Sequence, residues 1–501
     1  MALTRHLFLI ALTFFSGAIQ AKNVQNHEIL QNVRKSIFKI IASKAPIDPL
    51  RPWLQEKTDM SVGSGFYVGK NRILTNAHVV ADTRFLMVQQ DGDSRPRLAS
   101  VKAIAHDCDL ALLTIEEPWP ENQTLALTLG KMPELQSPVV VVGYPIGGEQ
   151  LSITTGTVAR MEMRRYVHSG VHEHLTIQVS SAINPGNSGC PIFQVQGNRI
   201  IVMAMAFQAH TGAENTGYGI PALVLDRFLR VTEKGPYEDH PILGVFMQPS
   251  QLNHEATARF YGVPPSEGVR VAHVVPWGSG AKYLKKGDIL LSTQGQPIGS
   301  DGKILFYGER VDFQVHYDLL VSGDIATFDV LRDQKRQTIS VPVTATLPHF
   351  DASHRYDKAP PYLVRGGLLF TPMTANYLQT FGPQWYQTAP LPLRFLFFYS
   401  YTEAEFENHE DFVVLAQRFP HPINEYANSY VNSMVKTVNG KKIKRFSEFV
   451  KAMADTTDPW IRIDFLHKGT PLLLSRKEEL EVRPQIFTQY GIPAETEGAV
   501  R

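Results

Sequence analysis

The chain has 501 residues and balances 49 Lys and Arg against 48 Asp and Glu, which gives a formal net charge of +1 with neutral histidines. This balance excludes bulk charge attraction as a basis for binding nucleic acid or an anionic membrane. The length predicts two to four domains, and a hydrophobic content of 43% is that of a globular protein with real cores.

Residues 1–21 have the pattern of a secretory signal peptide. Arg5 and His6 give a short basic start, residues 7–15 are apolar, and Ala21 fits the position before a cleavage site. The apolar run is shorter than the ~20 residues that a spanning helix needs, and no later segment is long enough either. We therefore expect a mature chain without a membrane span that is exported to a bacterial periplasm or secreted.

Short apolar segments separated by turn residues follow one another through residues 62–206, which is typical of a β-barrel or sandwich. A first strand is expected at residues 33–41. The first helical periodicity comes after Pro221, where residues 224, 225, 228 and 229 share one apolar face. This helix should end the first domain, and the polar segment 234–240 should be a linker.

A serine between glycines and prolines, in the segment Ile183-Asn-Pro-Gly-Asn-Ser-Gly-Cys-Pro191, does not suit a helix interior or a central strand. Such a turn exposes a hydroxyl beside backbone N–H groups, as an acyl-transfer nucleophile requires. It could equally be an ordinary surface turn. His78 upstream, and Asp109 directly before the apolar segment Leu110–Leu113, favour the nucleophile Ser188, because the chain order His, Asp, Ser is that of chymotrypsin-type barrels.

Several blocks together resemble the HtrA/Deg family of serine proteases. They are Gly63-Ser-Gly-Phe66, Thr75-Asn-Ala-His78, Asp109-Leu-Ala-Leu-Leu113, Gly143-Tyr-Pro145, Ala182-Ile-Asn-Pro-Gly-Asn-Ser-Gly189 and Gly217-Tyr-Gly-Ile-Pro221. The resemblance implies two six-stranded β-barrels with the active site between them. It also implies Ser188 as nucleophile, His78 as general base and Asp109 as its orienting carboxylate, with an oxyanion hole in the segment Gly186, Asn187 and Ser188.

Within the same resemblance, Ala204 and Ala206 would line the pocket for the substrate side chain, although they could be ordinary strand residues. The competing carboxylate is Asp107, which strand alternation would place on the same face as Asp109. Cys190 stands where the family usually has glycine, and we expect both cysteines, Cys108 and Cys190, to be small buried fillers.

Three histidines, His168, His172 and His174, lie close together in the sequence, at a spacing that could bind zinc. Glu173 is the only nearby carboxylate, and no cysteine is near enough to complete a metal site. A solvated loop is therefore the preferred interpretation. No metal and no cofactor is expected.

The second region resembles a PDZ domain, with Leu243, Gly244 and Val245 in its carboxylate-binding turn. Such domains add a peptide strand to a sheet edge and hold the peptide's C-terminal carboxylate on backbone donors. Val438-Asn-Gly-Lys441 and a following helix suggest a second, degenerate PDZ domain, a layout similar to the plant-type Deg proteases. That resemblance implies a homotrimer or a larger homo-oligomer.

The expected fold is mainly β: a chymotrypsin-like double β-barrel, one PDZ domain and a second, degenerate PDZ-like α+β domain. The expected divisions are a signal peptide 1–21, a protease domain 22–234, a PDZ domain 240–345, a linker 346–361, a PDZ-like domain 362–484 and a loose tail 485–501. The favoured function is an exported, ATP-independent serine endopeptidase that acts on unfolded or damaged proteins. A chaperone or peptide-binding scaffold with an idle barrel is the alternative, and the chain order argues against a lipase or esterase.

Overall fold

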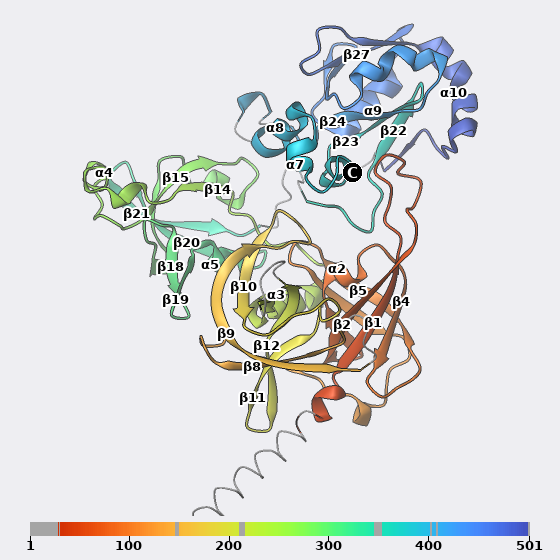
Figure 1. Cartoon of the computed structure of the whole chain (residues 1–501). Helices are drawn as coiled ribbons and strands as arrows, with labels where there is room; N and C mark the ends of the chain where they lie inside the picture. Colours follow the sequence, from red (N-terminus) through yellow and green to blue (C-terminus); the bar gives the residue numbers. More distant parts are fainter. Residues whose placement is uncertain are drawn as a thin grey trace, which may run out of the picture.

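A computed structural model describes residue 29 and residues 31–145, 150–209, 216–344, 353–400, 403–406 and 409–498. The proposed signal peptide lies outside these residues. Figure 1 shows two barrels at the centre of the molecule, with the second region in green and the third region in blue on different sides of them.

The first barrel is closed by six strands in the order β1-β2-β3-β6-β5-β4. The strands are β1 (Ile37–Lys44), β2 (Asp59–Gly69), β3 (Arg72–Thr75), β4 (Thr83–Gln90), β5 (Arg97–Ala105) and β6 (Leu110–Ile115). Branched and aromatic side chains such as Phe38, Ile40 and Ile73 fill its interior and are fully buried. The expected first strand starts late, because residues 31–34 are helical.

The second barrel is a ring of six strands, in the order β11-β8-β9-β10-β13-β12, which the pairing of β11 with β12 closes. The strands are β8 (Pro138–Gly143), β9 (Ser152–Arg165), β10 (Glu173–Val179), β11 (Pro191–Gln196), β12 (Arg199–Ala209) and β13 (Gly217–Pro221), and the short β7 (Thr128–Leu129) adds to β12 in parallel. The expectation of two six-stranded barrels is therefore confirmed.

The predicted helix after Pro221 is α3 (Ala222–Lys234), which buries Val224, Leu225 and Phe228 against the second barrel. Its Arg227 is also buried and donates from Nε to the backbone oxygen of Leu320 in the second region at 2.9 Å. The helix thus ties the protease barrels to the region that follows them.

The second region is a sheet in the order β14-β15-β16-β20-β21, with β17 paired to β16, and β14 forms one edge. Its strands are β14 (Val245–Gln248), β15 (Val269–Val274), β16 (Ile289–Thr293), β17 (Gln296–Pro297), β20 (Ile325–Arg332) and β21 (Lys335–Pro342), with a hairpin of β18 (Lys303–Phe306) and β19 (Glu309–Asp312) and the helices α4 (Glu255–Tyr261) and α5 (Gln314–Asp318). An exposed edge strand beside a short helix suits the addition of a peptide strand.

Among its described residues, the third region has two four-stranded sheets, five α-helices and two 3-10 helices. One sheet holds β22 (Tyr362–Arg365), β23 (Leu368–Pro372), β24 (Val413–Arg418) and β29 (Thr496–Glu497); the other holds β25 (Val435–Val438), β26 (Lys441–Lys442), β27 (Trp460–Phe465) and β28 (Leu472–Ser475). The helices are α6 (Ala375–Gln379), α7 (Trp385–Thr388), α8 (Leu391–Tyr399), α9 (Phe446–Asp455) and α10 (Arg476–Tyr490).

The expectation of a loose tail after residue 484 is wrong. Helix α10 continues through Pro484 to Tyr490, the side chain of Ile486 is fully buried, and β29 pairs with β22. Buried apolar contacts outweigh the helix-breaking tendency of one proline. Among the described residues, no helix has the length and apolar character needed to cross a membrane.

The packing of helix α10 can be tested with two substitutions, one at a buried side chain and one at an exposed side chain. We expect Ile486→Ala to lower the free energy of unfolding by about 2–5 kcal/mol, because it leaves a cavity in a packed core. Leu480→Ala, at a side chain that is 47% exposed on the same helix, should change it by less than about 1 kcal/mol. Urea unfolding followed by circular dichroism measures both, and equal effects would contradict the packing of this segment.

Candidate active site

His78 and Asp109 form a hydrogen-bonded pair at the mouth of the first barrel. The His78 ring contacts Asp109 through Nδ1 and Oδ2 at 2.7 Å, and the backbone N–H of His78 donates to Asp109 Oδ1 at 2.8 Å. His78 lies in the short helix α2 (Ala77–Val80). Its side chain is 33% exposed, whereas that of Asp109 is only 2% exposed, so the imidazole faces the solvent cleft from a buried carboxylate.

The turn that carries Asp109 has a strained backbone. Asp109 adopts φ = 56°, a left-handed conformation that few residues other than glycine adopt, and the Asn76 side chain donates to its carbonyl oxygen at 3.0 Å. Burial alone would raise the pKa of Asp109, but the neighbouring His78 ring and its hydrogen bonds hold that pKa below its ordinary value. The carboxylate is therefore ionised at neutral pH and can orient the imidazole.

Asp107 belongs to a different set of contacts. It lies with Asp109 in the turn before β6, so strand alternation does not relate the two residues as the sequence analysis assumed. Its carboxylate accepts from Tyr237 Oη at 3.0 and 3.1 Å and from the backbone N–H of His240 at 2.7 Å. Asp107 therefore contacts the junction with the second region, and it is Asp109 that contacts His78.

The loop that carries Ser188 is fastened to the first barrel through Ser64. The backbone N–H of Ser64 donates to the Ser188 carbonyl at 2.8 Å, and its hydroxyl donates to the Gly186 carbonyl at 2.9 Å. The same hydroxyl accepts from the backbone N–H of Tyr144 at 2.9 Å. Ser64 therefore holds the loop of the second barrel against the barrel that supplies His78 and Asp109.

Gly189 lies where a side chain cannot fit. It has φ = +89°, and a Cβ at this position would meet Ser64 O at 2.0 Å and Thr75 Oγ1 at 2.5 Å. Thr75 Oγ1 itself donates to Ser64 O at 2.7 Å. The glycine that follows Ser188 is thus required by close approach of the two barrels as well as by its backbone conformation.

The segment proposed for the oxyanion hole has two N–H groups that are left without a partner among the described residues. In the part of the chain that the structure describes, no hydrogen bond involves the N–H of Gly186 or of Ser188, and Gly186 has φ = 95°. The N–H of Asn187, in contrast, donates to the Asn184 carbonyl at 3.0 Å. Asn187 therefore contributes backbone to this segment but no donor.

Ser188 is half-buried at the surface between the barrels. A Cβ added at Gly63 would touch Val79 at 2.6 Å and Ser188 O at 3.3 Å, so the nucleophile loop lies next to the helix of His78. Within the described residues, no hydrogen bond joins the Ser188 hydroxyl to the His78 ring. In proteases without substrate this contact is often long and shortens when substrate binds.

Ala204 and Ala206, proposed for the substrate pocket, are fully buried on β12. Ala206 exchanges hydrogen bonds with the nucleophile loop: its N–H donates to the Cys190 carbonyl at 2.9 Å, and its carbonyl accepts from Gly189 N at 2.8 Å. Strand β12 therefore lies directly beside the loop of Ser188. A pocket for the substrate side chain has to lie next to the nucleophile, as this strand does.

The expectation of a solvated histidine loop is wrong for two of its three members, because His168 and His174 are buried. The ring of His168 lies 6.3 Å from that of His78 and stacks on Tyr356 at 4.1 Å, and Tyr356 Oη donates to the His168 carbonyl at 2.9 Å. Burial lowers the pKa of His168 to about 3, so its ring is neutral.

These contacts bring the segment before β22 over the catalytic surface. A cavity of about 570 Å³ lies between them, lined by His78, His168, Tyr356 and residues of α6. The Asp357 carboxylate accepts from the backbone N–H of Asp82 at 2.6 Å, and the backbone N–H of Asp357 donates to Asp82 Oδ1 at 2.7 Å. The expected linker is therefore docked on the first barrel in this part of the chain.

The two cysteines are free and buried, as the sequence predicted. Burial raises the pKa of both thiols well above the ordinary value. Both are therefore protonated and behave as small apolar side chains.

The carboxylate-binding turn proposed for the second region has a suitable backbone. Leu243 is buried, Gly244 has φ = +75°, and Val245 begins the edge strand β14. Among the described residues, no hydrogen bond uses the N–H of Leu243 or Gly244. The three residues line a cavity of about 390 Å³ that also contacts β10 of the second barrel.

Sequence reasoning missed Ser64, Asn76 and His168 as parts of the site. Ser64 and Asn76 stand inside quoted motifs, Gly63-Ser-Gly-Phe66 and Thr75-Asn-Ala-His78, and each makes a hydrogen bond across the cleft or to the turn of Asp109. Their polar side chains in otherwise apolar strand segments were the available signal. His168 gave none, because its neighbour Tyr356 is distant in the sequence.

The comparisons with known proteins agree with this geometry. A family model described as a trypsin-like peptidase domain matches residues 63–202, and one described as a PDZ domain matches residues 352–497. Protease Do-like 2, chloroplastic, from Arabidopsis thaliana is 32% identical over 489 residues, which cover 97% of this chain and 78% of the relative. The chain belongs to the HtrA/Deg family of serine proteases. It is a serine endopeptidase with a trypsin-like domain and a PDZ domain.

One more curated protein and one solved structure are similar to this HtrA/Deg protease. Protease Do-like 4, mitochondrial, from Arabidopsis thaliana is 37% identical over 369 residues, which cover 72% of this chain and 68% of the relative. A solved HtrA-type protease, AlgW with a tripeptide, is 22% identical, covers 64% of this chain and 96% of its own, and has a TM-score of 0.49. The matched PDZ model falls on the third region, so the expectation of a PDZ-like domain there is confirmed.

The close packing at Gly189 can be tested by comparing an alanine substitution there with an alanine substitution at a glycine that has open space around it. We expect Gly189→Ala to abolish activity and to lower the free energy of unfolding by more than about 3 kcal/mol, because its Cβ would overlap the Ser64 carbonyl. Gly197→Ala, at φ = +61° with no atom within 4 Å of the added Cβ, should cost only about 1–2 kcal/mol and leave activity unchanged. Thermal unfolding and peptide hydrolysis measure the pair; similar losses in both would contradict the overlap.

The pKa of Asp109 sets the shape of the pH profile. Since this pKa lies below its ordinary value, the carboxylate stays ionised over about pH 5–8, where an imidazole titrates. We expect Asp109 to take up no proton in this range, so that any acid limb of log(kcat/KM) for a fluorogenic peptide has a slope of one. A slope of two would show that Asp109 takes up a proton in the same range and would contradict its lowered pKa.

Proposed function

We propose that Ser188, His78 and Asp109 form the catalytic triad of an ATP-independent endopeptidase that cleaves unfolded or damaged proteins. The observation that carries the proposal is the bidentate contact between buried Asp109 and His78, beside a serine loop that is fastened to the same barrel through Ser64. The relatives named as Do-like proteases support the peptidase role.

In this mechanism His78 Nε2 accepts the proton of Ser188 Oγ while Oγ attacks the substrate carbonyl carbon. Asp109 accepts from His78 Nδ1–H and stabilises the imidazolium. The N–H groups of Gly186 and Ser188 donate to the oxyanion, each worth on the order of 3 kcal/mol in the transition state. His78 then protonates the leaving amine, and water hydrolyses the acyl-enzyme by the same steps in reverse. The proposed mechanism uses no cofactor.

Ala204 and Ala206 would form the wall of the primary pocket. Their small side chains on a strand bonded to the nucleophile loop leave room for a substrate residue of medium size and apolar character.

The second region would bind the C-terminus of a peptide, with Leu243, Gly244 and Val245 around its carboxylate. The unused N–H groups of the turn, the free edge of β14 and the adjoining cavity support this role. Assembly into homotrimers or larger homo-oligomers is part of the same proposal and rests on the family resemblance alone.

For localisation, we propose that residues 1–21 direct export and are removed. The basic start, apolar run and small residues before the cut support export. Two relatives carry chloroplastic and mitochondrial in their names, so the competing outcome is import into an organelle. N-terminal sequencing of the mature chain from its native cell, with fractionation, distinguishes a cut after Ala21 from a longer organellar leader.

The triad is testable by digestion of casein. We expect Ser188→Ala to abolish digestion and Asp109→Asn to lower kcat about 10⁴-fold, because the imidazole loses its orienting partner. Asp107→Asn is the matched control: it removes a carboxylate two residues away that does not contact His78, and should cost less than tenfold.

Equal digestion by the wild-type chain and Ser188→Ala would overturn the triad and leave a peptide-binding scaffold. If Asp107→Asn, folded by circular dichroism, loses as much activity as Asp109→Asn, the assignment of Asp109 is wrong.

A further inference from the structure

Three buried side chains meet where the second barrel joins the second region. His174 comes from β10, His240 from the segment after α3, and Asp318 from the end of α5, and their exposed fractions are 2%, 5% and 7%. One ligand atom from each lies within 4.8 Å of the others. Elements far apart in the sequence thus bring two imidazoles and a carboxylate to one point.

The spacing of these atoms suits a small metal ion. His174 Nδ1 lies 2.8 Å from Asp318 Oδ1, and His240 Nδ1 lies 2.9 Å from the same oxygen. His240 Nδ1 also donates to the backbone oxygen of Asp318 at 2.8 Å, so an ion bound through this nitrogen would break that contact and leave the ring proton on Nε2. Zinc binds imidazole nitrogen and carboxylate oxygen at about 2.0–2.2 Å, which places tetrahedral ligand atoms roughly 3.3 Å apart. Small side-chain shifts would therefore open the cluster around an ion.

The ring nitrogen of His174 that points away from Asp318 contacts a backbone carbonyl, as the far nitrogen of a metal-binding histidine often does. His174 Nε2 lies 3.1 Å from the carbonyl oxygen of Asp107, which can only accept. Nε2 therefore carries a proton, and without an ion Nδ1 shares a second proton with Asp318 Oδ1, which a metal ion would replace. A backbone carbonyl on the far nitrogen fixes the tautomer and orientation of a ligand histidine in this way.

Two atoms of the cluster lack a partner among the described residues. Asp318 Oδ2 and His240 Nε2 are buried and make no hydrogen bond. A buried polar atom left unsatisfied costs about 1–3 kcal/mol, and each such atom in a native protein calls for a missing ligand, water or ion. They are the second carboxylate oxygen and the second ring nitrogen of two members of the group, and a bound ion or water could satisfy them after a small rotation of either side chain.

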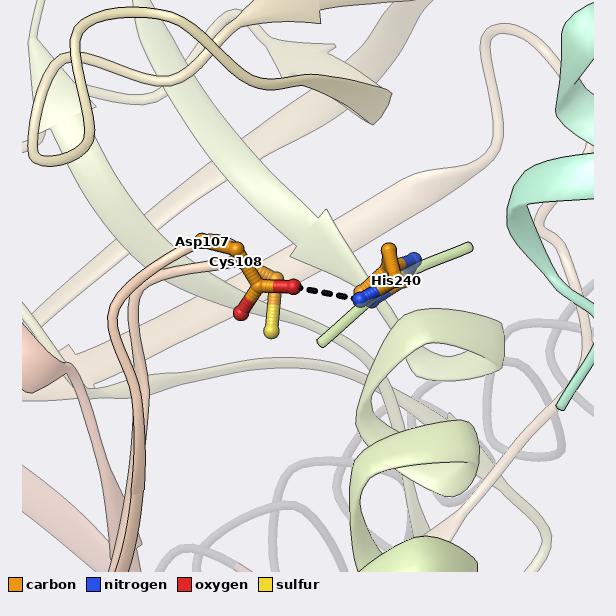
Figure 2. Close-up of side chains that lie close together, drawn as sticks. All are labelled: Asp107, Cys108 and His240. Atoms are coloured by element: carbon orange, nitrogen blue, oxygen red, sulfur yellow. Dashed lines mark hydrogen bonds between the residues drawn. The ribbon is translucent and has the colours of Figure 1, made fainter. Parts of the chain in front are cut away.

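A second group, Asp107, Cys108 and His240 (Figure 2), shares His240 with the first and is the weaker candidate. Both oxygens of Asp107 already accept hydrogen bonds from Tyr237 or His240. Burial raises the pKa of Cys108 well above its ordinary value, so the thiol is protonated and its sulfur is a poor ligand.

We propose that His174, His240 and Asp318 bind one divalent transition-metal ion of the zinc type and so join the protease barrels to the second region. Two nitrogens and one oxygen favour zinc, cobalt or nickel over magnesium and calcium. The same three residues line the cavity of about 390 Å³, which provides an entry route and room for a water as fourth ligand.

The simpler interpretation is a proton-bridged cluster without metal. Burial would lower the pKa of His174, but the Asp318 carboxylate holds it above its ordinary value, whereas burial lowers the pKa of His240. One shared proton would then neutralise Asp318. This arrangement predicts no metal affinity, so a binding measurement separates the two.

The experiment is a titration of the tag-free full chain in the Ser188→Ala background, which prevents self-digestion and leaves the cluster intact. We expect one Zn²⁺ per chain with a Kd in the low micromolar range or tighter, a rise in Tm, and no binding of Mg²⁺ at millimolar concentration. His174→Ala and Asp318→Asn should each weaken Zn²⁺ binding about 100-fold or more.

Two further measurements serve as controls for the zinc titration. His316→Ala, on the same helix α5 but outside the cluster, should retain wild-type affinity. Co²⁺ bound to the unmutated site should show visible bands of nitrogen and oxygen ligation, without the strong ultraviolet band of a thiolate.

Any of three results would overturn the proposal: no Zn²⁺ bound by the parent chain, unchanged affinity in folded His174→Ala or Asp318→Asn, or a thiolate band that makes Cys108 a ligand. None of these outcomes bears on the triad, because peptide hydrolysis is measured separately in the chain with Ser188.

Discussion

The active site depends on the hydrogen bonds that one small residue makes across the gap between two barrels. Ser64 holds the carbonyls of Gly186 and Ser188 through its hydroxyl and backbone N–H. These bonds join the loop of Ser188 to the barrel that carries His78 and Asp109, so they help to set the position of the nucleophile relative to both. The absence of a side chain at Gly189 lets the two backbones approach closely enough to make these bonds.

The second region is coupled to the same site through a buried polar junction. Asp107 accepts from Tyr237 and His240, Arg227 of α3 donates to Leu320, and Asp109 follows Asp107 by two residues. Charges buried in this way are strongly destabilising when one partner is removed. A displacement of the second region would therefore be felt in the turn that orients the catalytic imidazole.

Much of the protease part could be predicted from the sequence, because its motifs are local and their chain order is restrictive. The two barrels, the helix after Pro221 and the buried thiols followed from strand patterning and the quoted blocks. The solvated histidine loop and the loose tail failed for one reason: His168, His174 and Ile486 are buried by partners that are distant in the chain, Tyr356, Asp318 and the third-region core. Local periodicity carries no information about such partners.

The cysteine behind the nucleophile also constrains a neighbouring strand. A Cβ at Gly143, the last residue of β8, would lie 2.7 Å from the Cβ of Cys190. The space between these backbones admits one side chain and no more. The same Cβ would also lie 3.0 Å from Ser64 Oγ and 3.1 Å from Asn187 Oδ1, so reducing position 190 to glycine would relieve only part of the overlap. Glycine at 143 is thus required both by the thiol and by the hydroxyl that holds the nucleophile loop.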